Sequence, residues 1–166
     1  MPALTYLSLG SNLGNRESNL HDAIARLQAI GRVAAVSAFY ETAPVEFTEQ
    51  PWFLNCVVAL ETNMAPRELM AAVLAIEQEM GRHRTEQKKG PRTVDIDILL
   101  FDDQVVNSPD VTIPHPALHQ RRFVLQPLAE IAPDAIHPVL HKTVRELLAA
   151  LPAGQAVRKW VEHAEE

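Results

Sequence analysis

The order of the expected strands and helices along the N-terminal two thirds of the chain limits the fold more than any other feature of the sequence. Short apolar runs bounded by turn residues, as is typical of strands, lie at 4–9, 33–40, 53–61 and 94–101. Apolar residues recur at helical spacing in two runs that each end before a glycine, from Arg16 to Ile30 before Gly31 and from Pro66 to Met80 before Gly81. The expected order is therefore strand, helix, strand, strand, helix, strand.

This order predicts a ferredoxin-like α+β fold, in which a βαββαβ core forms a mostly antiparallel sheet with helices packed on it. The direct strand-to-strand connection in the middle argues against a doubly wound parallel sheet, whose strands alternate with helices. The connection itself, residues 41–51, carries two prolines and is long for an ordinary loop. Long loops are often functional, so we expect it to take part in the site.

The last third is expected to be a C-terminal extension of short strands and helices on the same core. Prolines spread along it argue against long helices: Pro109, Pro114, Pro116, Pro127, Pro133 and Pro138. A capping-box pattern from Thr143 to Glu146 predicts one short helix, which Pro152 would end. Because the chain has 166 residues and a typical domain has ~150, we expect residues 1–166 to form a single domain.

Composition argues against several classes of function. The chain has 15 basic and 21 acidic side chains, a net charge of −6, which is unlike a general binder of nucleic acids or anionic membranes. No stretch approaches the ~20 apolar residues that span a membrane, and the N-terminus shows no secretory signal. The single cysteine, Cys56, cannot form an internal disulfide and is expected to be an inert core residue. We expect a soluble, cytoplasmic monomer.

Two aspartates mark the fourth expected strand as a candidate metal site. Strand alternation places Asp95 and Asp97 on one face, about 6–7 Å apart, and Ile98 on the other. Mg²⁺ is usually held by one or two carboxylates together with substrate phosphates. The alternative is a half-exposed strand whose polar residues face water, and the residues alone leave both open. Leu99 and Phe101 continue the aspartate face and need cover, which places the carboxylates where that face opens into a cleft.

A basic segment precedes the aspartates. Only Glu86 opposes its five cationic side chains: Arg82, Arg84, Lys88, Lys89 and Arg92. A solvated surface loop is the ordinary interpretation of such a run. Because the segment leads directly into paired carboxylates, it also matches the parts needed to hold Mg²⁺ and a polyphosphate. Phosphate binding is the hypothesis that we favour.

Three other features carry weaker signals. Residues 10–14 (Gly-Ser-Asn-Leu-Gly) lack the lysine of a phosphate-binding P-loop and are interpreted as a tight turn that caps the first helix. His115 and His119 have a metal-like spacing, but no glutamate lies between them and a proline follows the first, so a zinc motif is not expected. Asn55 lies between apolar strand neighbours and, if buried, needs a hydrogen-bond partner that a ligand could supply.

Several segments, linked in order along nearly the whole chain, are similar to those of one enzyme family. They are residues 10–14, 40–44 (Tyr-Glu-Thr-Ala-Pro), 53–55 (Phe-Leu-Asn), 81–82 (Gly-Arg), 90–99 (Gly-Pro-Arg-Thr-Val-Asp-Ile-Asp-Ile-Leu) and 113–116 (Ile-Pro-His-Pro). Together they resemble the 6-hydroxymethyl-7,8-dihydropterin pyrophosphokinase family of folate biosynthesis. The resemblance implies transfer of pyrophosphate from ATP to the 6-hydroxymethyl oxygen of the pterin, release of AMP, and two Mg²⁺ ions bound by Asp95 and Asp97.

The same resemblance implies roles for individual residues. Catalysis would involve Asp95, Asp97, Arg82 and Arg92. ATP would be contacted by Arg82, Arg84, Arg92, Ile98, Thr112, His115 and Arg121. The pterin would lie against Thr42, Pro44, Val45, Phe53, Asn55, Asp95 and Phe123. The segments 44–51 and 82–92 would close over the substrates. This chain departs from some members at Lys89 and Pro116, where those members have aromatic residues.

Two other classes of function remain as alternatives. A non-catalytic binding module of the same shape would hold a partner's phosphate with the basic segment, and its binding would not depend on Mg²⁺. A metal-dependent phosphohydrolase would release phosphate from ATP without an acceptor, but no residue suggests a base that activates water.

Overall fold

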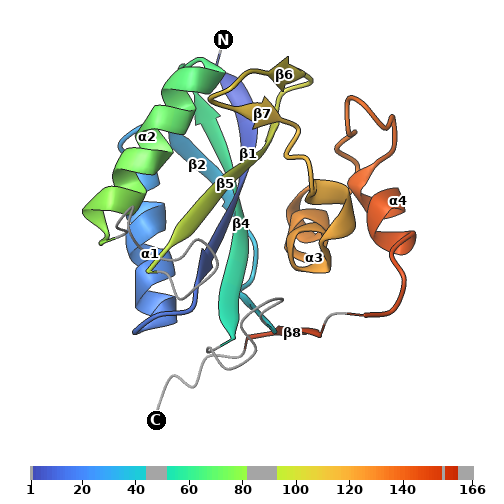
Figure 1. Cartoon of the computed structure of the whole chain (residues 1–166), viewed down its shortest axis with the longest axis horizontal. Helices are drawn as coiled ribbons and strands as arrows, with labels where there is room; N and C mark the ends of the chain where they lie inside the picture. Colours follow the sequence, from blue (N-terminus) through green and yellow to red (C-terminus); the bar gives the residue numbers. More distant parts are fainter. Residues whose placement is uncertain (1, 44–51, 82–92, 155, 161–166) are drawn as a thin grey trace.

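The computed structural model describes residues 2–43, 52–81, 93–154 and 156–160. Within them, six strands form one sheet in the order β5-β1-β4-β3-β8, with β2 also paired to β4 (Figure 1). The strands of this sheet are β1 (Ala3–Ser11), β2 (Arg32–Val36), β3 (Tyr40–Thr42), β4 (Phe53–Thr62), β5 (Asp95–Phe101) and β8 (Val157–Lys159). Two short strands, β6 (Val106–Asn107) and β7 (Thr112–Ile113), pair separately.

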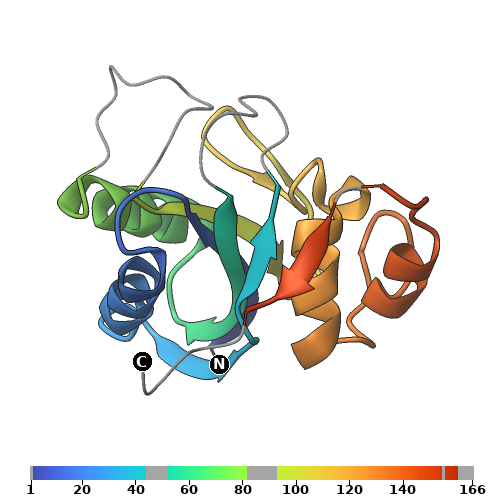
Figure 2. The same cartoon turned by 90° about the horizontal axis from the view of Figure 1, so that it is seen from below.

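Helices lie on both faces of this sheet. α1 (Arg16–Leu27) and α2 (Pro66–Glu79) cover one face, while α3 (Arg122–Ile131) covers the other and α4 (Val144–Ala149) packs on α3 (Figures 1 and 2). A 3-10 helix, Leu118–Gln120, precedes α3. Neighbouring strands of the sheet pair antiparallel, and the order β5-β1-β4-β3 is that of a ferredoxin-like βαββαβ core, so the predicted fold is confirmed. None of the helices in the described part of the chain has the length and hydropathy required to span a lipid bilayer.

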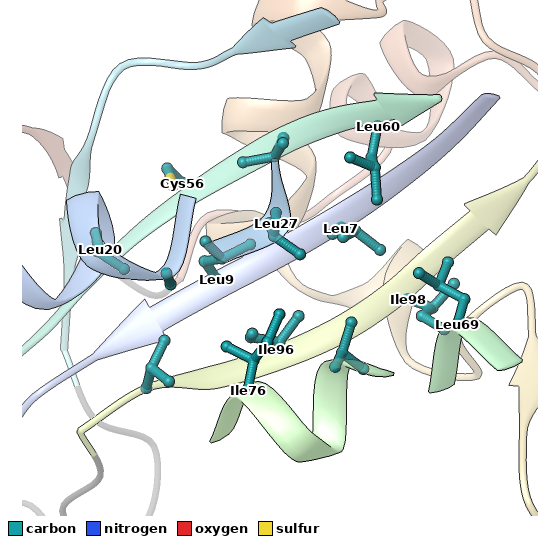
Figure 3. Close-up of a cluster of buried hydrophobic side chains, with 14 of the residues drawn as sticks. Leu7, Leu9, Leu20, Leu27, Cys56, Leu60, Leu69, Ile76, Ile96 and Ile98 are labelled. Atoms are coloured by element: carbon teal, nitrogen blue, oxygen red, sulfur yellow. The ribbon is translucent and has the colours of Figure 1, made fainter. Parts of the chain in front are cut away.

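The larger hydrophobic core lies between the sheet and the helices α1 and α2. Figure 3 shows side chains of both layers that meet there: Leu7, Leu9, Leu20, Leu27, Cys56, Leu60, Leu69, Ile76, Ile96 and Ile98. Alternate residues of each strand point into this layer, as the alternation in the sequence predicted for 53–61. The intervening residues therefore face α3 and are available for a site.

Cys56 is fully buried in this core, and burial raises the pKa of its thiol to about 12. Because the thiolate is the reactive form of cysteine, we expect the folded protein not to react with a thiol reagent such as DTNB at neutral pH. The chain's single thiol should react once the protein is unfolded in urea. Rapid reaction of the folded protein would show that this face of β4 is not buried.

The strand expected over 33–40 is in fact two strands, β2 and β3. Ser37 interrupts the pairing with β4: its backbone N–H donates to the carbonyl of Val57, and its side-chain oxygen accepts from the N–H of Val57, both at 2.9 Å. The side chain thus replaces a backbone partner, and the chain bends between Val36 and Tyr40. Of the two strands, only β3 pairs with the part of β4 that carries the candidate site residues Phe53 and Asn55.

The two helices of the core start as predicted, but one of them ends early. Asn15 caps α1 by accepting from the N–H of Ser18, and the helix ends at Leu27, so the expectation that Gly31 terminates it is wrong. Gly31 instead permits a close approach to β4, where an added Cβ would collide with a backbone carbonyl. Gly81 does follow α2, with a positive φ of 103°, as predicted.

The helices described in the last third are short, as expected, but one proline lies inside α3 and not at its end. This helix runs for ten residues with Pro127 inside it, although a proline there removes one backbone hydrogen bond. Burial of its apolar face against β4 and β5 compensates, through a second cluster that includes Val57, Leu99, Leu125 and Leu128. The capping box predicted at the start of α4 is present.

A register shift between β1 and β5 changes which residues of β5 share a face. The shift lies between Tyr6 and Leu7 of β1. Leu99 and Leu100 consequently both pack on the α3 side, and Phe101 returns to the core beneath α1 and α2. The expectation that Phe101 continues the aspartate face is therefore wrong, whereas Leu99 does lie on that side.

Strand β3 is held from the α1 side by two ion pairs. Glu41 Oε2 lies 2.8 Å from Arg16 Nη2 at the start of α1, and Glu41 Oε1 lies 2.9 Å from Arg158 Nη2 of β8. Burial alone would raise the pKa of the Glu41 carboxyl. The hydrogen bonds and charges of the two arginines outweigh burial and hold the pKa below its usual value.

We expect this carboxylate to contribute to the loss of stability in acid. A carboxyl whose pKa is lower in the folded state stabilises the fold above its unfolded pKa of ~4.3, and this contribution is lost as the pH falls below that value. Urea unfolding at about pH 5 and about pH 3 should show a smaller acid-induced loss for Glu41→Gln than for the wild type. Asp103→Asn, which removes an exposed carboxylate, is the control. An equal acid-induced loss of stability in Glu41→Gln and Asp103→Asn would contradict the role of Glu41.

Candidate active site

Three strands bring a carboxylate, a glycine and an amide into one row on the α3 side of the sheet. Gly10 of β1 is opposite Asp95 of β5 on one side and Asn55 of β4 on the other. Directly opposed residues point to the same face, and strands lie about 4.8 Å apart, so the two polar residues flank the glycine at about 10 Å from each other. The row has a gap at its centre because Gly10 has no side chain.

The gap at Gly10 is bordered closely on the β4 side. A Cβ added there would lie 2.6 Å from Asn55 Oδ1 and 3.5 Å from Phe53 Cδ1. An added methyl would therefore occupy the space that Asn55 and Phe53 border. The glycine provides a flat floor between an amide, an aromatic ring and a carboxylate.

Asn55 is oriented by strand β3. It is 4% exposed, and its Nδ2 donates to Thr42 Oγ1 at 2.7 Å. This hydrogen bond directs the amide oxygen toward the floor at Gly10, where a ligand with an N–H group would find an acceptor. Thr42 is thus one hydrogen-bond partner of the buried Asn55, through the amide nitrogen. The amide oxygen of Asn55 lies close to the floor.

Asp97 lies in the next row of the same face. It is opposite Ser8 of β1, which in turn is opposite Val57 of β4, and its side chain is 38% exposed. Asp95 is also partly exposed. The two carboxylates therefore share one face and are accessible to solvent, as the strand alternation predicted.

His115 lies beside the aspartates. Its Nε2 is 4.0 Å from Asp97 Oδ1, and its Nδ1 accepts from the backbone N–H of Ala117 at 3.1 Å, so a neutral ring carries its proton on Nε2. Burial and the positive charge of Arg121 lower the pKa of His115, and the charge of Asp95 opposes them without reversing the shift. The imidazole is neutral at neutral pH and directs a hydrogen-bond donor toward the carboxylate side.

Arg121 precedes α3 and acts on His115 through its positive charge, and Phe123 lies in the first turn of that helix. The guanidinium carbon of Arg121 lies 5.5 Å from the centre of the Phe123 ring. Thr112 is exposed on β7, which packs next to β5. Ile98 is 2% exposed in the core beneath α1 and α2, so its side chain is on the other face of β5 from the aspartates. Any contact of Ile98 with a nucleotide would involve its backbone.

The described residues therefore contain part of the predicted site. The structure brings together the groups around Gly10 (Thr42, Phe53 and Asn55, with Asp95) and the groups around the carboxylates (Asp97, His115 and Arg121), and Phe123 lies against Arg121. The remaining predicted residues, Pro44, Val45, Arg82, Arg84 and Arg92, lie outside the described residues, as do Lys89 and the segments 44–51 and 82–92.

One residue of the site, Gly10, and one residue that supports it from α2, Glu77, were missed from the sequence. Gly10 was interpreted only as part of a turn, although β1 continues to Ser11 and the glycine forms the floor. Glu77 of α2 is 2% exposed, and its Oε2 accepts from the backbone N–H of Ile96, between the two aspartates, at 2.7 Å. A sequence signal existed for Glu77, since it lies four residues after Val73 on the apolar stripe of α2.

The donor set of the carboxylate face suits magnesium. Within the described ranges, no group of three His, Cys, Asp or Glu side chains is placed to hold a metal ion. A pair of accessible aspartates suits Mg²⁺, which is usually held by one or two carboxylates and keeps several waters or shares substrate phosphates. The residues present therefore fit a magnesium–polyphosphate rather than a closed structural metal site.

By its fold and its paired carboxylates, the chain falls in the class of α+β domains with a candidate magnesium and small-molecule site. Residues 6–133 match the family model of 7,8-dihydro-6-hydroxymethylpterin-pyrophosphokinase (HPPK). The 2-amino-4-hydroxy-6-hydroxymethyldihydropteridine pyrophosphokinase of Methylorubrum extorquens is 45% identical over 90% of this chain and 94% of its own length. The Bacillus subtilis protein of the same name is 40% identical over 96% and 92%, respectively. The chain belongs to the HPPK family.

Some relatives are much longer than this chain. The folic acid synthesis protein fol1 of Schizosaccharomyces pombe is 45% identical over 93% of the chain, which covers 21% of that protein. A crystal structure of Plasmodium falciparum HPPK-DHPS with pteroate superposes with a TM-score of 0.71 and 17% identity. The superposition covers 90% of this chain and 42% of the HPPK-DHPS chain. At that identity the likeness concerns the fold alone.

Proposed function

We propose that this protein transfers the pyrophosphoryl group of ATP to the hydroxymethyl oxygen of 6-hydroxymethyl-7,8-dihydropterin, giving AMP and the pterin diphosphate in tetrahydrofolate biosynthesis. The observation that carries the proposal is the row Asp95, Gly10, Asn55, which gives a flat heterocycle a floor and two polar edges. Membership of the HPPK family supports it, as do the names of relatives matched over nearly their full length.

The pterin would lie over Gly10, with its polar edge on Asn55 and Thr42 and its hydroxymethyl end toward Asp95. Asn55 Oδ1 faces the floor, so it can accept from a ring N–H or amino group of the pterin. Phe53 and Phe123 would pack on the two sides of the ring. Pro44 and Val45 would complete the rim.

ATP would bind on the carboxylate side, with Arg82, Arg84 and Arg92 on its phosphates and Arg121, Thr112, His115 and the backbone of Ile98 around the rest. Asp95 and Asp97 would hold two Mg²⁺ ions together with the phosphates. Bound Mg²⁺ supplies neutralisation of charge on the phosphate oxygens and a lowered pKa for the attacking hydroxyl. His115, neutral and with Nε2–H toward this side, can donate a hydrogen bond to a phosphate oxygen.

The reaction would be an in-line displacement. The hydroxymethyl oxygen attacks the β-phosphorus, the bond from that phosphorus to the α-phosphate oxygen breaks, and AMP leaves. The hydroxyl proton would pass to Asp97 or to water. Catalysis then rests on positioning by the floor and its borders and on charge neutralisation by the arginines and aspartates.

The test is an assay of purified protein with ATP, Mg²⁺ and the hydroxymethyl-dihydropterin, with nucleotide products separated. We expect AMP and pterin diphosphate in equal amounts, and no product after chelation of Mg²⁺ with EDTA. Formation of ADP would contradict the proposal, and so would the absence of turnover by a folded protein. Phosphate release without pterin would indicate the phosphohydrolase, and ligand binding without turnover would indicate the binding module.

We further propose that the protein acts as a cytoplasmic monomer and that residues 1–166 form one pyrophosphokinase domain. A single cysteine supports a reducing compartment. Two hydrophobic clusters share the one sheet, which supports a single cooperative unit. Light scattering should give a mass near 18.5 kDa, and thermal unfolding should show one transition.

A further inference from the structure

The C-terminal strand and the first helix converge on β3 in one cluster of side chains. We call this cluster the β3 clamp: Arg16, Glu41, Trp52, Arg158 and Trp160. Besides their ion pairs with Glu41, the two arginines lie over the two tryptophans, Arg158 at 4.6 Å from the ring centre of Trp52 and Arg16 at 5.2 Å from that of Trp160. Arg16 Nη1 also donates to the backbone carbonyl of Trp52 at 2.9 Å.

Strand β8 completes the clamp through its backbone. It pairs antiparallel with β3, so that Thr42 is opposite Val157, and the N–H of Trp160 donates to the carbonyl of Phe39 at 2.7 Å. β3 is therefore flanked by β4 on one side and β8 on the other (Figure 2). Because β3 is only three residues long, pairing with β4 alone would hold it weakly. Pairing with β8 gives β3 a hydrogen-bonded neighbour on its second edge as well.

The other face of β3 carries the groups that shape the site. Strand alternation directs Glu41 toward α1 and its neighbours Tyr40 and Thr42 toward α3. Thr42 Oγ1 accepts from Asn55 Nδ2 at 2.7 Å, and Tyr40 donates to Glu130 of α3 at 2.8 Å. The position of β3 thus decides where the Asn55 amide points.

We propose that β8, through Arg158 and Glu41, is a positioning element for the pterin side of the active site. A displacement of β3 would move Thr42 and turn the Asn55 amide away from the floor at Gly10. The carboxylates belong to β5, which is separated from β3 by β1 and β4, so the ATP side is not affected. This inference rests on the proposed function, because it assigns the amide to pterin binding.

The first test compares two arginine variants of the full chain. Arg158→Ala is expected to weaken binding of 6-hydroxymethyl-7,8-dihydropterin about tenfold, whereas the dissociation constant of Mg²⁺-ATP should stay within about twofold. Arg145→Ala is the matched control, since Arg145 has a similar exposure (65% against 67%) and pairs at 2.9 Å with Asp134, away from β3. It should leave both constants unchanged. Arg158→Lys keeps the charge and should recover part of the pterin affinity.

A double-mutant cycle separates positioning from a general loss of stability. Thr42→Val removes the hydroxyl that orients Asn55, so adding Arg158→Ala to it should weaken pterin binding little further. Independent effects would multiply instead, and this result would overturn the proposal.

Tryptophan fluorescence reports on the clamp directly. Both tryptophans of the chain belong to it, so the emission of Arg158→Ala should change in the absence of ligand while that of Arg145→Ala should not. Unchanged pterin affinity in Arg158→Ala, or an equal loss for pterin and ATP, would overturn the positioning role. If the wild-type protein forms AMP and pterin diphosphate, the proposed function stands even when the positioning role of Arg158 is overturned. A wild type that binds no pterin would overturn both.

Discussion

Replacing Asp97 with alanine is expected to lower turnover by about 10²–10³-fold, the scale of losing one key electrostatic stabiliser of a transition state. The carboxylate is partly exposed on the site face of β5, and its Oδ1 lies 4.0 Å from His115 Nε2. Within the described ranges, no cluster of three metal-binding side chains exists that could take over its role. The measurement is the initial rate of AMP formation at saturating ATP and pterin.

Two further variants make this result specific. Asp97→Asn keeps the shape of the side chain and removes only its charge, so it should show a comparable loss if charge is what matters. Asp103→Ala removes an exposed carboxylate beyond the end of β5 and should retain the wild-type rate. Pterin affinity should change little in Asp97→Ala, because Asp97 lies one row away from the floor at Gly10. A rate near that of the wild type would remove the metal-binding assignment.

The features that could be predicted from the sequence depend on local patterns. The alternation along β4 and β5 fixed which residues face the core, and the faces of Asn55, Asp95 and Asp97 follow from it. The order of the elements left few arrangements other than a ferredoxin-like sheet, because sequential strands joined directly are antiparallel and helices must cover an apolar face. The side of the sheet on which Asp95 and Asp97 lie could therefore be predicted from the sequence.

The features that could not be predicted depend on contacts between distant segments. The register shift between β1 and β5 places Phe101 in the core beneath α1 and α2, and it depends on how these two strands pair. The break between β2 and β3 at Ser37 depends on a hydrogen bond to Val57. Pro127 is tolerated within α3 because the sheet buries the helix, which no local propensity expresses. The short strand β8 carries almost no signal of its own and forms through its pairing with β3, where Arg158 meets Glu41.

Replacing Gly10 with alanine is expected to weaken pterin binding by tenfold or more while Mg²⁺-ATP binding remains near that of the wild type. An added Cβ would lie 2.6 Å from Asn55 Oδ1, a distance that requires Asn55 or β1 to shift. Overpacking of this kind costs roughly 1–3 kcal/mol, and each ~1.4 kcal/mol is tenfold in affinity. Asn55 cannot move freely because Thr42 holds its amide. Titration of each variant with pterin and with ATP gives the two constants.

A second substitution distinguishes loss of the floor from a general disturbance of the sheet. If the added methyl occupies the floor, the double variant Gly10→Ala, Asn55→Ala should bind pterin more weakly than Asn55→Ala alone, whereas equal affinities would mean that the conflict is with the Asn55 amide only. Gly154→Ala is the control, since a Cβ there meets its nearest neighbour only at 4.0 Å. Wild-type pterin affinity in Gly10→Ala would mean that the ring does not lie over β1. In that case the pterin-binding site would be defined by Asp95 and Asp97, and Gly10 and Asn55 would not belong to it.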